Sequence, residues 1–260
     1  MFLKNLWYFA LPGHALKPGA MTAKQLLGEP VLIARDDAGK PFAIRDICPH
    51  RGIPLSCGAF DGKEVECCYH GWRFGGDGHC TAIPSLVPDQ KFNIDRVKVR
   101  AYPCREVQGN IRVFFGDDDA DTGDPPIVPE LGERAPGLSE SMEFPCHVDH
   151  AVVGLMDPAH GPFVHQSWWW RSRRSIHEKS KAFGPSPRGF TMLRHPPSSN
   201  SAAYKLLGGA MTTEISFQLP GVRIEHVRAG KHVLCNLTAV TPVSETETVV
   251  HNAIYWTQPW

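Results

Sequence analysis

The chain has 260 residues, 42% of them hydrophobic and 21% charged, a composition that can bury a sizeable core and a length that suits two domains. Lys and Arg together number 27, as do Asp and Glu, so the formal net charge is zero, which argues against a nucleic-acid-binding protein. Since no apolar run approaches the roughly 20 residues of a membrane-spanning helix, and the N-terminal residues lack the apolar region and cleavage site of an export signal, we expect a cytoplasmic protein without a membrane partner.

The first half of the chain is expected to be all-β. The 24 Gly and 23 Pro exceed average usage and indicate many turns. Apolar runs at 31–34 and 42–44 flank Asp36-Asp37-Ala38-Gly39, which predicts a hairpin. Five more strands are expected before residue 116, at 65–67, 72–74, 80–83, 97–100 and 111–115.

The second half has a different organisation. Residues 116–137 are acidic and rich in Pro and Gly, which predicts a linker between a domain at 1–115 and a second domain at 138–260. In the second domain the pattern favours one helix near 147–157. Alternating apolar and polar residues then predict strands at 212–219, 222–227, 233–240 and 248–256. The expected fold class is α+β: an all-β first domain, then a mixed domain with an antiparallel sheet and helices.

Two short segments of the first domain each combine cysteine with histidine. Cys48-Pro49-His50 and Cys67-Cys68-Tyr69-His70 each offer one thiolate and one imidazole. Two Cys and two His can hold a tetrahedral zinc ion, although zinc fingers usually draw both Cys from one arm and both His from the other. Mixed arms suit a two-iron cluster in which one iron takes both sulfurs and the other takes both imidazoles.

The segments Cys-Pro-His-Arg-Gly and Cys-Cys-Tyr-His-Gly-Trp resemble the Rieske [2Fe–2S] motif. The resemblance implies that Cys48 and Cys67 bind one iron and that His50 and His70 bind the other. The family usually has Pro at the position of Cys68. Cys57 and Cys68 do not stand at the offsets of the disulfide found in respiratory Rieske proteins, so we expect free, half-buried thiols there.

A second pair of histidines lies in Asp157-Pro158-Ala159-His160-Gly161-Pro162-Phe163-Val164-His165. Residues five apart on a regular helix point about 140° away from each other. His160 and His165 can therefore meet one metal ion only if the helix is deformed, and Gly161-Pro162 between them provides for this. Asp157-Pro158 has the pattern of an N-cap followed by a first-turn proline.

Asp-x2-His-x4-His resembles the catalytic-domain motif of Rieske non-haem iron oxygenases, in particular the single-subunit monooxygenase and demethylase branch. The resemblance implies that His160 and His165 bind a mononuclear Fe(II), and that Asp157 links a Rieske histidine of a neighbouring subunit to an iron-bound histidine. It also implies a homotrimer. The third ligand in the family is an Asp far downstream, which we expect beyond residue 260. Gly154 stands where the family often has Asn.

The remaining features favour ordinary structural roles. Trp168-Trp169-Trp170 is expected to pack in a core or an interface, and His79, His147 and His150 are not assigned as ligands. The basic residues of 171–181 are expected to be solvated, with docking of an acidic ferredoxin or an anionic substrate as the alternative. Core packing is expected for the scattered cysteines Cys80, Cys104, Cys146 and Cys235.

The resemblance implies the oxygenase component of a Rieske-type system. Electrons from NAD(P)H would arrive by way of a separate reductase or ferredoxin, and dioxygen would hydroxylate or demethylate an organic substrate, often an aromatic one. Two other functions stay open: a Rieske-type electron carrier without a catalytic iron, and a zinc-binding structural protein.

Overall fold

The computed structural model describes residues 1–117, 119–157, 159–164, 180–196 and 211–257. The chain divides into two compact units. One consists of Met1–Pro125 with Thr241–Glu245, and the other of Pro126–Val240 with Thr246–Trp260. The break at Pro125 falls inside the predicted linker. Among the described residues, no helix combines the length and the apolar character that a bilayer crossing requires.

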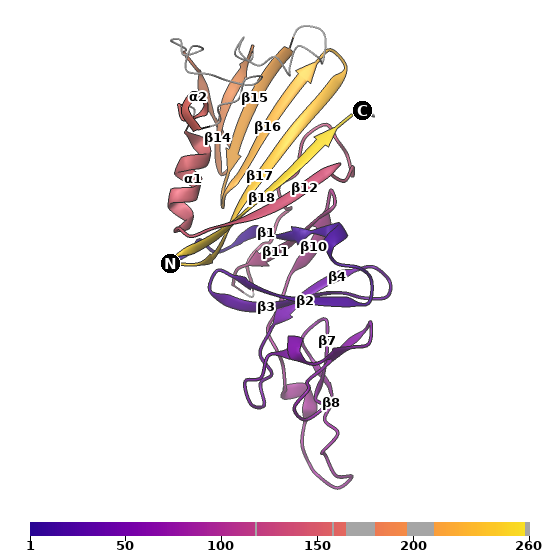
Figure 1. Ribbon diagram of the computed structural model, residues 1–260. Helices are drawn as coiled ribbons and strands as arrows, with labels where there is room; N and C mark the ends of the chain where they lie inside the picture. Colours follow the sequence, from indigo (N-terminus) through magenta and orange to yellow (C-terminus); the bar gives the residue numbers. More distant parts are fainter. Residues whose placement is uncertain (118, 158, 165–179, 197–210, 258–260) are drawn as a thin grey trace. The chain divides into compact units, whose positions relative to one another are not determined.

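The first unit is built from three antiparallel sheets (Figure 1). One sheet has the order β1-β11-β10, the second β2-β3-β4-β9 and the third β5-β6-β7-β8. The strands are β1 (Leu6–Pro12), β2 (Ala20–Leu26), β3 (Glu29–Arg35), β4 (Pro41–Arg45), β5 (Ala59–Phe60), β6 (Glu64–Glu66), β7 (Arg73–Gly75), β8 (Cys80–Ala82), β9 (Ala101–Tyr102), β10 (Cys104–Val107) and β11 (Asn110–Phe115).

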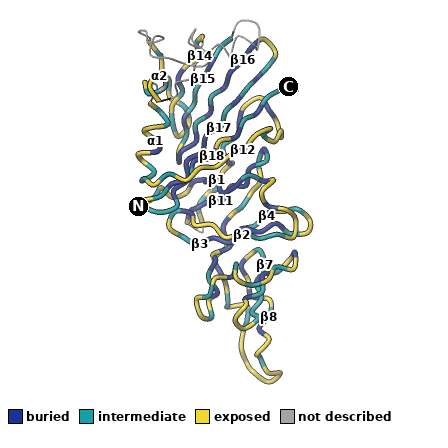
Figure 2. The backbone as a smooth tube through the Cα atoms, viewed as in Figure 1, coloured by how far each residue is buried: buried dark blue, intermediate teal, exposed yellow. Residues whose placement is uncertain are grey.

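Two cores hold these sheets together. Residues of β1, β3 and β11 supply most of the first core, with Ile33, Ile111 and Val113 fully buried. The second core lies under the third sheet and includes Cys48 and Cys67 beside fully buried aliphatic and aromatic side chains. Figure 2 shows the buried stretches along β1, β3 and β11. The two cysteines expected to bind metal thus belong to a hydrophobic core.

Most of the predicted strands of this unit are present, and one is not. The hairpin around Asp36 forms as β3 and β4, closed by the bond from Asp36 N to Lys40 O (3.0 Å). The strand predicted at 97–100 is wrong, because within it only Lys98 makes a bridge, to His79. Arg100 O accepts a hydrogen bond from Arg45 N (2.8 Å), and the chain enters its next strand, β9, one residue later. Alternation of apolar and charged residues alone did not distinguish this connection from a strand.

The second unit contains one antiparallel sheet of seven strands in the order β12-β18-β17-β16-β15-β14-β13. Its strands are β12 (Leu138–Phe144), β13 (Phe183–Ser186), β14 (Gly189–His195), β15 (Met211–Gln218), β16 (Val222–Ala229), β17 (His232–Ser244) and β18 (Glu247–Trp256). The four strands predicted in this region are confirmed, each within a few residues. β12, β13 and β14 were not predicted.

The helix α1 (Val148–Met156) confirms the prediction for 147–157. His147 precedes it, and its ring Nδ1 accepts a hydrogen bond from Asp149 N (3.2 Å), which makes His147 the N-cap. Ala151 packs against Val240 and Val250, so α1 covers one face of the sheet. A short helix, α2 (Gly161–Val164), follows.

The opposite face of the sheet is covered by residues 126–137. Val128 is fully buried and Leu131 is 6% exposed. Glu130 pairs with Arg228 and lies 3.7 Å from His226 Nε2. On the other side of the ring, Arg194 Nη2 lies 3.2 Å from His226 Nδ1.

His226 is therefore neutral at neutral pH. A guanidinium can only donate, so Nδ1 must accept and the ring proton sits on Nε2, towards Glu130. Burial lowers the pKa of His226; Arg194 and Arg228 lower it further, while Glu130 and Glu214 oppose them. The imidazole side chain is 3% exposed, so a charge on it would be poorly solvated.

This arrangement predicts acid sensitivity. A histidine whose pKa is lowered in the folded state contributes stability above its ordinary pKa of 6.5, and that stability is lost as the pH falls below this value. We expect the melting temperature to drop more between pH 7.5 and pH 5.5 in the wild type than in His226→Gln. His150→Gln, at an exposed position of α1, is the matched control. Equal slopes in all three proteins would contradict the assignment of a neutral, buried His226.

Candidate metal centres

The two cysteine–histidine segments form two equivalent loops. In the first, Cys48 N donates to Ile53 O (2.8 Å) and Gly52 N donates to Cys48 O (2.9 Å). In the second, Cys67 N donates to Trp72 O (2.8 Å) and Gly71 N donates to Cys67 O (3.0 Å). Each loop therefore begins at a cysteine and turns at a glycine four residues later.

The glycines are required by the backbone. Gly52 has φ +75° and Gly71 has φ +67°, a region that other residues enter only with strain. This explains why a Gly stands four residues after each of the two cysteines. The two loops therefore have the same backbone hydrogen bonds. They differ in the position of the histidine, which stands two residues after Cys48 but three residues after Cys67.

Each loop is also held from outside. Asp46 is 4% exposed, and its carboxylate accepts hydrogen bonds from Ser56 N (2.7 Å) and Ser56 Oγ (2.6 Å), which fixes the residues on either side of the first loop. In the second loop, a Cβ added at Gly71 would lie 3.2 Å from Pro84 Cγ. Asp46, Ser56 and Pro84 were not identified from the sequence, because their partners are ten or more residues away.

The thiols of the two loops face each other inside the core. Cys48 and Cys67 are each 2% exposed. Burial raises the pKa of the Cys48 thiol to about 11, and its neighbour Cys67 adds to this, whereas backbone N–H groups of His50 and Arg51 favour the thiolate. Two thiolates in such a place need a compensating positive charge, which metal ions supply.

The imidazoles lie side by side at the outer edge of the same loops. The ring centroids of His50 and His70 are 4.5 Å apart, and His50 stacks on Trp72 at 4.5 Å with the planes 2° apart. His50 Nδ1 is buried and has no hydrogen-bond partner among the described residues. His70 is exposed and touches Tyr69.

This donor set fits a [2Fe–2S] cluster. Two sulfurs lie together in the core, two imidazoles lie together outside it, and one imidazole nitrogen is buried with its lone pair or proton unused. Among the residues that the structure describes, no three His, Cys, Asp or Glu side chains converge as ligands of a single ion. Ligands divided into two pairs match two irons better than one zinc.

The second predicted centre is only partly within the described residues. His165 lies outside them, as do Trp168-Trp169-Trp170 and the basic stretch up to Lys179. His160 is described: its carbonyl accepts from Phe163 N (2.9 Å) and Val164 N (2.8 Å), so the turn of α2 begins at this residue. The regular helix indeed ends before the histidine pair.

Asp157 caps the end of α1 and does not start a new helix. It is the C-cap residue, and its Oδ1 accepts a hydrogen bond from Ala159 N (2.7 Å). The helical turn that was expected to begin at Asp157 begins at Gly161 instead. Asp157 Oδ2 lies 3.7 Å from His160 Nδ1, so the carboxylate also faces the predicted ligand.

The cysteines outside the ligand set are free thiols. Cys57 and Cys68 are exposed, which corrects the expectation that they are half-buried. Both lie beside the ligand loops, at the turn before β5 and next to Cys67, where the chain faces solvent. Cys80 and Cys235 are buried, as core packing requires, and Cys104 and Cys146 are partly buried.

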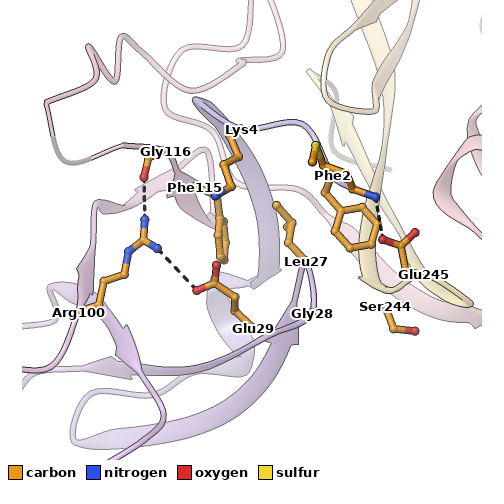
Figure 3. A pocket seen from close by; sticks show the side chains of 11 residues that line it. Phe2, Lys4, Leu27, Gly28, Glu29, Arg100, Phe115, Gly116, Ser244 and Glu245 are labelled. Atoms are coloured by element: carbon orange, nitrogen blue, oxygen red, sulfur yellow. Dashed lines mark hydrogen bonds and ion pairs between the residues drawn. The ribbon is translucent and has the colours of Figure 1, made fainter. Parts of the chain in front are cut away.

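A cavity of about 390 Å³ lies elsewhere in the first unit (Figure 3). Four of its charged groups are paired: Arg100 donates to Gly116 O (2.7 Å) and lies 3.8 Å from Glu29, and the Met1 amine contacts Glu245 Oε1 (2.8 Å). Phe2, Leu27 and Phe115 add apolar surface. None of the predicted ligands lines this cavity.

Comparison with known proteins agrees with these loops. The protein-family model for the Rieske [2Fe–2S] domain matches residues 6–103 of this chain. The chain is 38% identical over 174 residues to chlorophyllide a oxygenase, chloroplastic, of Chlamydomonas reinhardtii, covering 65% of this chain and 25% of that protein. It is 33% identical over 159 residues to 4beta-methylsterol monooxygenase of Methylococcus capsulatus, covering 60% of this chain and 43% of that protein.

Residues 6–103 are thus a Rieske [2Fe–2S] domain, and the chain is similar to oxygenases over about 60–65% of its length. It spans less than half the length of these two relatives. The fold agrees over nearly the whole chain with the crystal structure of dicamba monooxygenase bound to dicamba, with a TM-score of 0.79 at 22% identity, covering 97% of this chain and 78% of that one. It agrees similarly with NdmA of Pseudomonas putida CBB5 bound to caffeine, in the QL mutant, with a TM-score of 0.77 at 16% identity, covering 98% and 74%.

Two expectations are thereby confirmed: the Rieske [2Fe–2S] domain in the first half of the chain, and the α+β fold with that all-β domain ahead of an antiparallel-sheet domain. The individual ligand assignments stay predictions.

The close approach of Gly58 to the second loop gives a test of the cluster site. A Cβ at Gly58 would lie 1.9 Å from Glu66 O and 3.1 Å from Cys68 N, both backbone atoms. Because overpacking of this kind costs about 1–3 kcal/mol, we expect Gly58→Ala to displace Cys67 and to lower the iron and acid-labile sulfide content of the purified protein.

Ala59→Ser, at the exposed neighbouring position, serves as the control and should keep both. Full iron and sulfide content in Gly58→Ala would show that the second loop is not held by this contact.

Proposed function

We propose that this chain is the oxygenase component of a Rieske-type system, which hydroxylates or demethylates an organic substrate with dioxygen and electrons derived from NAD(P)H through a separate reductase or ferredoxin. The observation that carries the proposal is the pair of equivalent loops, with buried Cys48 and Cys67 on one side and adjoining His50 and His70 on the other. The Rieske [2Fe–2S] domain and the similarity to oxygenases support the kind of reaction.

The proposed ligand sets divide the work between two centres. Cys48 and Cys67 would hold one iron of the cluster, and His50 and His70 the other. His160 and His165 would hold a mononuclear Fe(II). When bound, the cluster supplies one-electron transfer and the ferrous ion supplies the activation of dioxygen. Around them, the chain positions its ligands: Trp72 orients the His50 ring by stacking, and backbone N–H groups stabilise the Cys48 sulfur.

Asp157 is proposed as a positioning residue. Its carboxylate faces the His160 imidazole at 3.7 Å and is anchored by Ala159 N, so it can fix the orientation and tautomer of that ring. The outer edge of His70 is exposed and is available to a carboxylate from another molecule. We therefore propose that Asp157 of one subunit meets His70 of the next, which requires a closed ring such as a homotrimer.

The iron content distinguishes an oxygenase from an electron carrier. We expect three irons per chain in the full-length polypeptide that contains residues 1–260, prepared without oxygen, and two in the His160→Ala variant. The [2Fe–2S] spin-resonance signal of the reduced protein should be the same in both. Two irons in the wild type would support a carrier, and a colourless protein containing zinc would overturn both functions.

The link through Asp157 makes a separate prediction. We expect Asp157→Asn to keep three irons and an unchanged cluster signal, because the amide can still accept a hydrogen bond from Ala159 N. Substrate oxidation should slow by about 10–100-fold, the usual effect of losing such a supporting carboxylate. In single-turnover experiments the rate of cluster reoxidation should fall with it. Normal turnover in Asp157→Asn would refute the positioning role.

A further inference from the structure

The helix α1 covers one face of the seven-stranded sheet, and His160 follows soon after this helix ends at Met156. Ala151 of α1 packs against Val240 and Val250. A Cβ added at Gly221 would lie 3.7 Å from Val152 Cγ2. Since side chains alternate along strands, every second residue from Gly221 on β16 and from Val240 on β17 shares this face. In Figure 1, α1 runs along the strands towards α2.

Beyond its contact with α1, this face becomes polar. The residues in question are Arg223 and Glu225 on β16, Asn236 and Thr238 on β17, and Asn252 on β18. Arg223 Nη2 donates to Glu225 Oε2 (3.1 Å), and the two side chains are only 15% and 23% exposed. Thr238 Oγ1 donates to Asn252 Oδ1 (2.8 Å). Four of the five residues are thus paired with each other, and the ion pair adds no net charge.

Two polar atoms of the same face are not satisfied in this way. Asn236 Oδ1 and Thr213 Oγ1 are buried and have no hydrogen-bond partner among the described residues. Thr213 is 3% exposed. Asn236 lies opposite Glu225, directly beside the ion pair, and Thr213 lies opposite Val227 on the neighbouring strand. Because an amide oxygen only accepts, the group that completes Asn236 Oδ1 must be a donor.

Apolar side chains stand on the same face, beside Thr213 on β15 and on the neighbouring strand β14. Ile215 and Phe217 of β15 stand opposite Met192 and Phe190 of β14. The rings of Phe190 and Phe217 are 5.6 Å apart and tilted by 31°. A mostly apolar wall with a few fixed polar groups is the usual composition of a small-molecule site.

We propose that this face selects the substrate, and that the substrate is a neutral ring compound which presents an N–H or O–H donor to Asn236 Oδ1 while its ring extends over β16 towards Ile215 and Phe217 of β15. Because Arg223 and Glu225 neutralise each other, this face has no net charge to compensate for the desolvation of a charged substrate, so a carboxylate or a cation is disfavoured. The proposal rests on the proposed function, because it names the substrate class of that same centre.

Three matched probes test this selectivity: 4-methoxybenzamide, 4-methoxybenzoate and 4-methylanisole. Binding to the metal-loaded, full-length polypeptide is measured by titration calorimetry and ligand NMR, without reductant, so that no turnover is needed. We expect the benzamide to bind most tightly. Asn236→Leu should weaken benzamide binding about tenfold and leave the binding of 4-methylanisole unchanged, since one hydrogen bond is removed.

Two further variants separate recognition from folding. Asn236→Asp keeps an acceptor oxygen and should retain benzamide binding. Ser216→Ala lies on the opposite face of β15 and should change the affinity for none of the probes. All variants should melt within a few degrees of the wild type. Equal affinity of the wild type for the three probes, or unchanged benzamide binding by Asn236→Leu, would overturn the proposal.

The failure of this inference can be told apart from failure of the proposed function. If the protein holds two irons but binds the probes in the expected order, the oxygenase function fails and the recognition by Asn236 stands. If it holds three irons and Asn236→Leu binds the benzamide as the wild type does, only the substrate class is wrong.

Discussion

The burial of two facing cysteines is the constraint on which the rest of the first domain depends. Cys48 and Cys67 lie in a hydrophobic core, yet a metal cluster needs them as thiolates, which such surroundings oppose. The chain meets this conflict with two loops of the same plan. Each is closed by two backbone hydrogen bonds and turns at a glycine with positive φ. In the first loop the N–H groups of His50 and Arg51 favour the Cys48 thiolate, and the imidazoles of both loops lie at the edge.

The placement of the imidazoles explains how such a centre can exchange electrons. The cysteines are sealed from solvent, whereas His70 is exposed and His50 is fixed between His70 and Trp72. Two neutral ligands in place of two thiolates leave a cluster less negative and raise its reduction potential. Under the proposed function, the exposed His70 imidazole would be the ligand nearest to a partner, because Cys48 and Cys67 are each only 2% exposed.

The second domain uses its sheet asymmetrically. One face is closed by residues 126–137, with Val128 buried and His226 held neutral between arginines and Glu130. The other face carries α1 and then a polar area around Asn236. Apolar packing and charge pairs on one face stabilise the sheet. The other face can therefore keep polar atoms without hydrogen-bond partners, and a ligand can supply those partners.

The sequence by itself determined the kind of fold and predicted the cluster site. Cysteine, histidine and glycine at these spacings form a local pattern, and each loop is closed by atoms within five residues of its cysteine, so no distant contact is needed to recognise it. The alternation of side chains likewise predicted the strands from 212 onwards, because they pair in order along the chain. The strand at 97–100 was predicted on the same alternation and failed, since its pairing with residues 78–80 is confined to the single bridge between Lys98 and His79, which alternation does not foretell.

Only the tertiary structure decided the features whose partners lie far apart in the sequence. Trp72 against His50, Asp46 with Ser56, and Glu130 with His226 are such pairs, and nothing in their local sequence marks them. Asp157 shows the same limit: its pattern suited an N-cap, but the packing of α1 on Val240 and Val250 extends that helix to Met156 and makes Asp157 its end. Which polar atoms of the sheet are left without partners depends on all the strands together, and so it became visible only once they were paired.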